Sequence, residues 1–166
     1  MDIKDFSNTY EVRRLEEADT AMIYELCRAN EMYYEYCPPF VTEKSILDDM
    51  NALPPGKQMD DKFYVGFFEK QELIAVMDLI NQFPDDNTTF IGFFMTKVSE
   101  QNKGVGTQII TDLSTYLLKN GTRYIRLAWV KGNPQAERFW KKNGFVETGI
   151  TQDTGDYTVV VAEHTL

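Results

Sequence analysis

Residues 101–107 (QNKGVGT) have the composition of an anion-binding turn. They follow an apolar, β-rich run and lead directly into residues with helical periodicity. The first N–H groups of a helix lack an intrahelical partner, and the helix dipole makes the potential there positive, so such a junction attracts phosphate. Gly104 and Gly106 carry no Cβ, which would let an anion approach the backbone N–H groups closely.

The spacing of these glycines does not fit two common nucleotide-binding turns. A P-loop reads G-x-x-x-x-G-K-[ST], whereas only Val105 separates the two glycines here and Lys103 precedes them. A dinucleotide fingerprint reads G-x-G-x-x-G, and Ile109 stands where its third glycine would be. A nucleotide-binding module is therefore a distant alternative.

A second segment, NPQAERFWKKNGF, has the boundaries of a short helix: Asn133 suits the N-cap, Pro134 the first turn and Gly144 the stop. QNKGVG and NPQAERFWKKNGF, in this order with a strand between them, resemble the GNAT superfamily of acyl-CoA-dependent N-acetyltransferases. That signature is [RQ]-x-x-G-x-[GA] followed by N-x-x-A-x-x-[FL]-[YW]-x-K-x-G-F. The motifs cover roughly residues 90–147, and the order of elements is similar along the whole chain.

The resemblance implies transfer of an acetyl group from acetyl-CoA to a primary amine of a small-molecule or protein acceptor, by direct attack on the thioester and without a metal. The pyrophosphate of acetyl-CoA would lie at the glycine turn, against the backbone N–H groups of residues 102–107, with Lys103 and the Thr107 hydroxyl assisting. In the family, the strand before this turn separates from its neighbour and pairs with the pantetheine arm.

By spacing from Gln101, the strand segment that would contact pantetheine is Phe94, Met95 and Thr96. The backbone N–H of Phe94 would polarise the thioester carbonyl, and the Asn133 side chain would contact the pantetheine arm. The residues that the resemblance implies for acetyl-CoA binding are Phe94, Met95, Thr96, Gln101, Asn102, Lys103, Gly104, Val105, Gly106, Thr107 and Asn133.

Two positions depart from the family's pattern. Many members carry a glutamate general base on the strand before the turn, and counting back from Gln101 places Phe90 there. Many also carry a tyrosine that protonates the CoA thiolate, and its position here is Trp140, whose indole N–H donates a hydrogen bond but no proton near neutral pH. The general base and acid stay open, and a non-catalytic acyl-CoA binding or sensing domain is the alternative function.

Amine deprotonation would then fall to water or to a weakly placed group with an unshifted pKa. The segment ANEMYYEYCPPF could form an aromatic, acidic cup for an amine, and packing of its tyrosines over the sheet is an equal alternative. The weak candidates for the acceptor site are Glu31, Tyr33, Tyr34, Glu35, Tyr36 and Asp78. The net charge of −9 favours a cationic acceptor and argues against a nucleic-acid partner.

The elements that position these residues are expected in the order β-α-α-β-β-β-α-β-α-β-β. This order predicts an α/β (α+β), GNAT-like mixed sheet of about six to seven strands with about four flanking helices. Asp19 and Thr42 are expected to cap the first two helices, the segment with Pro38 and Pro39 to break the helical pattern, and Lys70 and Gln71 to form a hairpin turn.

The length of 166 residues suits a single domain over residues 1–166. The two cysteines and one histidine predict neither a disulfide framework nor a metal site. Neither a signal peptide nor a membrane span is expected, so a cytoplasmic location is predicted. A homodimer is common in the resembled family, and the oligomeric state stays open here.

Overall fold

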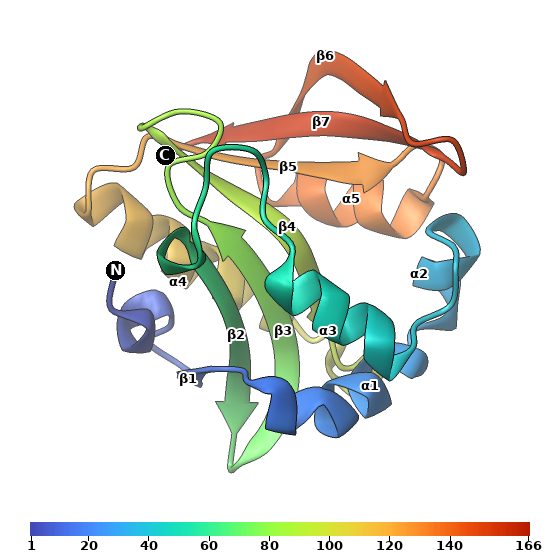
Figure 1. Cartoon of the computed structure of the whole chain (residues 1–166). Helices are drawn as coiled ribbons and strands as arrows, with labels where there is room; N and C mark the ends of the chain where they lie inside the picture. The colour runs from blue at the N-terminus through green and yellow to red at the C-terminus, as the bar shows by residue number, and fades with distance from the viewer.

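Seven strands form one mixed sheet in the order β1-β2-β3-β4-β5-β7-β6. Figure 1 shows this arrangement in the computed structural model, which describes residues 1–166. Every neighbouring pair is antiparallel except β4 and β5, which are parallel. The strands are β1 (Glu11–Arg14), β2 (Lys62–Glu69), β3 (Glu72–Ile80), β4 (Thr88–Thr96), β5 (Tyr124–Val130), β6 (Val146–Asp153) and β7 (Thr158–Thr165). The predicted mixed fold is confirmed.

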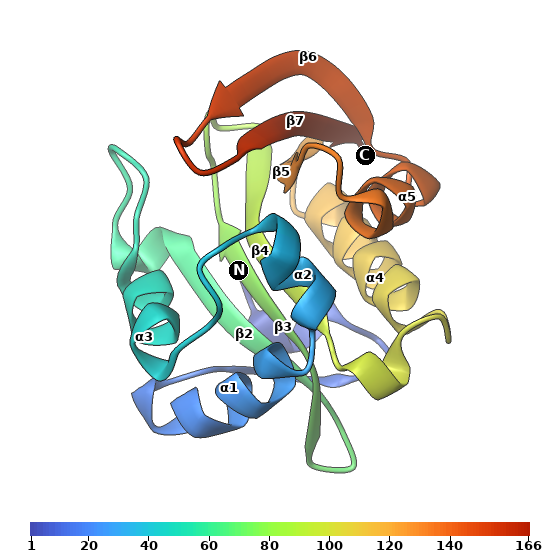
Figure 2. The same cartoon turned by 90° about the vertical axis from the view of Figure 1, so that its right-hand side faces the viewer.

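The α-helices lie on both faces of this sheet. In Figure 2, α3 lies to the left of strands β2 to β4, α1 lies below them, and α4 lies to their right. None of the helices is long and apolar enough to cross a membrane. The helices are α1 (Thr20–Arg28), α2 (Glu31–Tyr36), α3 (Glu43–Asn51), α4 (Val105–Lys119) and α5 (Pro134–Lys142).

The helix α2 corrects the expected element order, which has two helices between the first two strands. The sequence predicts a break in the helical pattern over residues 32–40 (MYYEYCPPF), because Pro38 and Pro39 lack a backbone N–H. Pro38 and Pro39 come only after the helix has ended, and a proline restricts the residue before it without disturbing the earlier turn. The segment therefore completes one short helix before the chain turns toward α3.

Two of the three predictions about local structure, the cap at Thr42 and the hairpin turn, are confirmed, and the cap at Asp19 is wrong. Thr42 caps α3 by accepting from the Ser45 N–H at 3.0 Å, as predicted. Asp19 does not cap α1, because its carboxylate accepts from the Arg13 guanidinium at 2.8 Å and 2.9 Å and from the Glu16 N–H at 2.9 Å. Lys70 and Gln71, both with positive φ, form the predicted turn between β2 and β3.

Two apolar cores stabilise the two faces of the sheet. The larger one lies beneath α4 and α5 and includes Met77, Ile91 and Leu113. The smaller one lies beneath α1 and α3 and includes Ile23, Val76 and Met95. Because side chains alternate along a strand, neighbours such as Val76 and Met77 on β3, or Phe94 and Met95 on β4, pack into different cores.

Candidate active site

The strands β4 and β5 separate half-way along their length. Thr88 to Ile91 pair with Tyr124 to Leu127, and no pairing follows, although β4 runs on to Thr96 and β5 to Val130. The separation coincides with a bulge, because Asp78 of β3 pairs with Phe93 and Leu79 pairs with Ile91, which leaves Gly92 as an extra residue. A bulge bends its strand and increases its twist. The bulge therefore accounts for the point at which β4 leaves its neighbour.

The backbone of Phe94 faces the gap that this separation opens. Backbone N–H and C=O groups point alternately to the two sides of a strand. The Lys97 N–H donates to the Ile74 carbonyl on the β3 side at 2.8 Å, so Phe94 and Thr96 present their backbone groups to the β5 side. There the Thr96 carbonyl accepts from the side-chain amides of Asn30 and Gln101, each at 3.3 Å, while β5 provides no pairing partner for Phe94.

The glycine turn lies between β4 and α4. Gly104 is the N-cap residue of α4, with φ +84°, and a Cβ there would meet no atom within 4 Å. Its positive φ is the reason for a glycine at this position. Asn102 and Lys103 are exposed, and Lys103 lies 3.5 Å from Glu100. Val105 is buried in the larger core, and Thr107 is half-buried on the first turn of the helix.

Gly106 has a packing role that the sequence did not predict, in addition to the predicted one of letting a phosphate approach the backbone. It is buried, and a Cβ on it would lie 3.0 Å from Cε2 of the Phe139 ring on α5. The missing side chain thus allows α4 and α5 to approach each other. Of the two glycines, only Gly104 is open on its outer side.

The N-terminus of α5 meets the glycine turn at the gap. The Gln135 amide donates to the Gln101 side chain at 3.2 Å, and the Gln101 amide donates to Asn30 Oδ1 at 2.6 Å. Asn133 is 3% exposed and caps α5 by accepting from the N–H groups of Gln135 and Ala136, as predicted. The structure therefore gathers the two sequence motifs and the end of β4 in one place.

The chain matches the model of the "Acetyltransferase (GNAT) family" over residues 22–145, three quarters of its length. The protein belongs to the GNAT acetyltransferase family. No curated protein sequence matched it significantly.

Solved structures of acetyltransferases share the GNAT fold. An acetyltransferase from Thermus thermophilus superposes with a TM-score of 0.76 at 17% identity, covering 95% of this chain and 97% of that one. The PaiA N-acetyltransferase from Thermoplasma acidophilum, solved with coenzyme A, gives 0.69 at 19% identity over 95% and 99% of the two chains. AAC(6')-Ib, solved with ribostamycin and coenzyme A, gives 0.72 at 20% identity over 95% and 94%.

The two positions that depart from the GNAT pattern are apolar in their surroundings. Phe90 pairs with Arg126 on β5 and contacts Phe83 edge to face, with ring centroids 5.7 Å apart. Trp140 is 8% exposed and packs against the rings of Phe94 and Phe145 at 5.9 Å and 5.0 Å. Neither position holds a group that accepts or donates a proton near neutral pH.

The α2 segment places its aromatic side chains over β4, while its glutamates face water. The ring of Tyr33 lies edge-on to Phe93 at 5.9 Å and to Tyr34 at 5.0 Å. Glu31 and Glu35 are exposed, and Tyr36 is half-buried. The predicted acidic cup is therefore reduced to an aromatic wall on this face of the sheet.

Tyr157, on the turn before β7, also reaches this wall, and nothing in its local sequence indicated so. The neighbouring Cys37 thiol, followed by burial, raises the pKa of Tyr157 to about 12. Burial and then Cys37 raise the pKa of Tyr33 well above its usual range, and Tyr157 contributes to that rise. The turn between β6 and β7 thus lies beside α2 across the face of β4.

Asp78 is the one acceptor-site candidate that is a buried carboxylate. Its Oδ2 lies 2.8 Å from Nζ of Lys62 on β2, and the two side chains are 13% and 1% exposed. Its Oδ1 is buried and has no hydrogen-bond partner. Burial raises the pKa of Asp78, and the Lys62 ammonium opposes that rise. The expectation of an unshifted pKa is therefore wrong for this residue.

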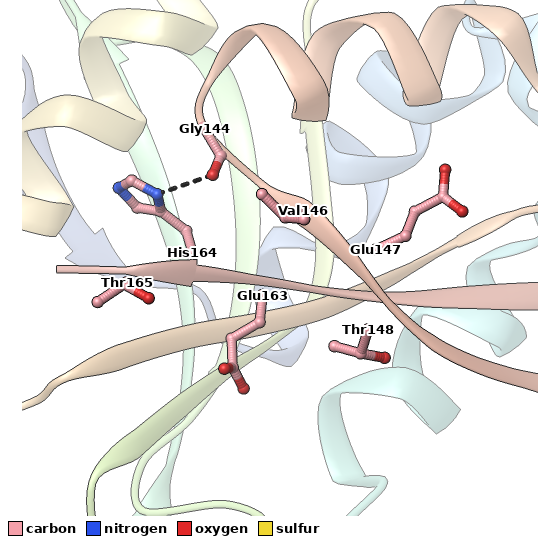
Figure 3. Close-up of a pocket in the computed structure, with 7 residues that line it drawn as sticks. All are labelled: Gly144, Val146, Glu147, Thr148, Glu163, His164 and Thr165. Carbon is pink, nitrogen blue, oxygen red and sulfur yellow. Dashed lines mark hydrogen bonds between the residues drawn. The ribbon is translucent and has the colours of Figure 1, made fainter.

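A hollow of about 410 Å³ lies at the end of α5, away from the gap between β4 and β5. Figure 3 shows the side chains that line it, from the strands β6 and β7 and the Gly144 corner. Its carboxylates are already paired, Glu163 with Arg126 and Glu147 with Lys141, and His164 Nδ1 lies 3.0 Å from the Gly144 carbonyl. This hollow offers no free group for acyl transfer.

Proposed function

We propose that this GNAT protein transfers the acetyl group of acetyl-CoA to a primary amine by direct attack of the amine on the thioester. The observation that carries the proposal is the separation of β4 from β5 after Ile91, with the backbone of Phe94 facing the gap. An extended ligand with amide groups can pair with such a free strand edge. A thioester carbonyl beside the Phe94 N–H would be polarised by it.

The glycine turn fits the phosphate end of the same ligand. The first N–H groups of α4 are free to donate, and the helix dipole favours a negative charge at its N-terminus. Gly104 leaves the outer side of the turn open, and Lys103 adds a positive charge that is 60% exposed. Asn102 to Thr107 would hold the pyrophosphate, and Phe94, Met95, Thr96, Gln101 and Asn133 would line the path to the thioester.

The structures with coenzyme A and with ribostamycin support a CoA thioester and an amine as the two substrates. Which amine this chain acetylates is a question for an acceptor panel of polyamines, aminoglycosides, amino acids and peptides. A cytoplasmic location stays a prediction of the sequence, and the oligomeric state stays open. The alternative, an acyl-CoA sensing domain, keeps the ligand site and lacks the transfer.

The test pairs an acceptor screen with two matched glycine variants. Gly104 and Gly121 lie at opposite ends of α4, both have positive φ, and at both a Cβ would meet no atom within 4 Å. Asparagine tolerates this conformation, so Gly104→Asn and Gly121→Asn carry the same conformational cost. We expect only Gly104→Asn to weaken CoA binding, by about tenfold or more, which is about 1.4 kcal/mol.

The parent protein should release CoA thiol only when an accepted amine is present, and mass spectrometry should show the acetylated amine. Binding of CoA without release for any amine would favour the sensing domain. Equal CoA affinity in the two glycine variants would contradict the proposed pyrophosphate site.

A further inference from the structure

A buried ion pair lies on the face of the sheet that carries α1, α2 and α3. Lys62 opens β2 and is 1% exposed, and its Nζ lies 2.8 Å from Oδ2 of Asp78 on β3. The second carboxylate oxygen, Oδ1, is buried without a hydrogen-bond partner. Buried ion pairs contribute little net stability compared with apolar residues. Stability alone therefore does not account for this pair.

Gly92, the extra residue of the β4 bulge, lies directly beside this carboxylate. A Cβ on Gly92 would lie 2.8 Å from Asp78 Oδ2, and Gly92 is exposed to solvent. Any side chain here would therefore cover the carboxylate, whereas glycine leaves an atom-sized space at hydrogen-bond distance from Oδ2. The bulge thus brings a buried carboxylate within reach of a polar atom that approaches from outside.

This space is close to the backbone group that would bind the thioester. Asp78 pairs with Phe93, and Phe94 is the next residue along β4. Phe93 lies on the same face as Asp78, beneath the Tyr33 ring. Consider a thioester carbonyl that accepts from the Phe94 N–H. An amine that attacks it from the face of the sheet that carries α2 would come close to Asp78.

We propose that Asp78 is the catalytic base of this protein: it binds the acceptor's ammonium group beside Gly92 and takes its proton. Lys62 is a positioning residue, which fixes the carboxylate and keeps it ionised. The inference rests on the proposed transfer from acetyl-CoA. It also narrows the acceptor to an amine that is protonated in solution.

The proton and electron movements balance. The ammonium gives one proton to the Asp78 carboxylate, and the free nitrogen lone pair forms the N–C bond while the carbonyl electrons move to oxygen. Collapse of the tetrahedral intermediate breaks the C–S bond, and the sulfur leaves with its electron pair. The nitrogen loses its second proton to the departing thiolate, which gives an amide and CoA thiol, and Asp78 returns its proton to water.

The charged groups around Asp78 favour one further cation. Lys62 and Tyr64 face it from β2, and Asp49, exposed on α3, lies near enough to be influenced by its charge. Desolvation and then the charge of Asp78 raise the pKa of Asp49, and the β4 residues on this side, Gly92, Phe93 and Met95, carry no charge. With Lys62, Asp78 and Asp49 all ionised, the set carries one net negative charge, which a single ammonium would neutralise.

The test compares Asp78→Asn, which keeps the shape of the side chain, with Asp48→Asn, which removes the same charge from an exposed position on α3. We expect Asp78→Asn to lower kcat/KM near neutral pH by about a hundredfold or more, with the dissociation constant for CoA unchanged. Asp48→Asn should match the parent. A fall of less than about threefold in Asp78→Asn would overturn the proposal.

The pH profile of the parent supplies a second readout that needs no variant. With two acceptors of different amine pKa, the rise of kcat/KM on the acid side should level off at the same apparent pKa if Asp78 accepts the proton. An acid-side rise that shifts with the amine pKa of the acceptor would overturn the role of Asp78. Absence of CoA release with every amine would overturn the proposed transfer itself, so the two failures are distinguishable.

Discussion

Removing the buried ammonium of Lys62 should leave Asp78 as an unpaired buried carboxylate. Lys62→Met keeps a flexible side chain of similar length and removes only the charge. Both oxygens of Asp78 would then lack a partner, because Oδ1 already has none and Oδ2 loses the hydrogen bond at 2.8 Å. Breaking one partner of a buried pair in this way costs about 3 to 5 kcal/mol.

An upper bound follows from protonation of the carboxyl group. The ordinary pKa of an aspartate is about 3.9 and each pKa unit is worth about 1.36 kcal/mol, so keeping Asp78 protonated near pH 7 costs about 4 kcal/mol. We therefore expect Lys62→Met to lower the free energy of unfolding by about 3 to 4 kcal/mol near neutral pH.

The loss should shrink as the pH falls. In the variant the folded-state pKa of Asp78 lies above the unfolded value, so between the two the folded protein binds more protons than the unfolded chain. In this pH range the variant's free energy of unfolding therefore rises by up to about 1.4 kcal/mol for each unit by which the pH is lowered, relative to a chain without this group. The stability that protonation of Asp78 contributes is fully present below its pKa in the unfolded chain, and it is lost as the pH rises through its pKa in the folded protein.

Urea unfolding, followed by the fluorescence of the buried Trp129 and Trp140, measures the difference between variant and parent from about pH 5 to about pH 7. The double variant Lys62→Met/Asp78→Leu should recover most of the loss, because an apolar pair can replace a buried ion pair. A difference that is constant with pH, or below about 1 kcal/mol, would refute the reasoning.

Two further predictions concern α5 and its contact with α4. Trp140→Phe should leave turnover within about tenfold of the parent, about 1.4 kcal/mol of barrier, because the indole packs against Phe94 and Phe145 and is not an acid; a thousandfold loss with CoA affinity intact would contradict this. Gly106→Ala should lower the midpoint of thermal unfolding, because its Cβ would lie 3.0 Å from the Phe139 ring; a midpoint equal to or above that of the parent would show that the ring moves away freely.

The parts of the fold that the sequence predicted depend on local signals. The cap and proline at Asn133 and Pro134, the hairpin turn at Lys70 and Gln71, and the strand–glycine–helix junction each occupy a few consecutive residues. The prolines after α2 are also a local signal, but they restrict only the residue directly before them. The sequence therefore did not predict α2, which ends at Tyr36, with only Cys37 between it and the prolines.

The sequence did not predict the contacts between side chains of different elements. Asp19 bonds to Arg13 of β1 instead of capping α1, and Tyr157 reaches α2 from the other end of the chain. Lys62 had a usable signal, because it and Asp78 are opposite charges at the far ends, away from the turn, of two apolar strands that one hairpin joins, which places them near each other. Their burial, the bulge at Gly92 and the free edge of Phe94 required the register of the whole sheet.

The bulge at Gly92 has a consequence for changes in the length of β4. Because Gly92 and Phe93 together oppose Asp78, a chain that lacked Gly92 would keep Ile91, Phe93 and Phe94 on their present sides of the sheet. Only the bend would disappear, and the parallel ladder between β4 and β5 could close over its remaining length. Whether β4 pairs with β5 along its whole length or separates from it after Ile91 thus depends on one inserted residue. That residue changes neither core.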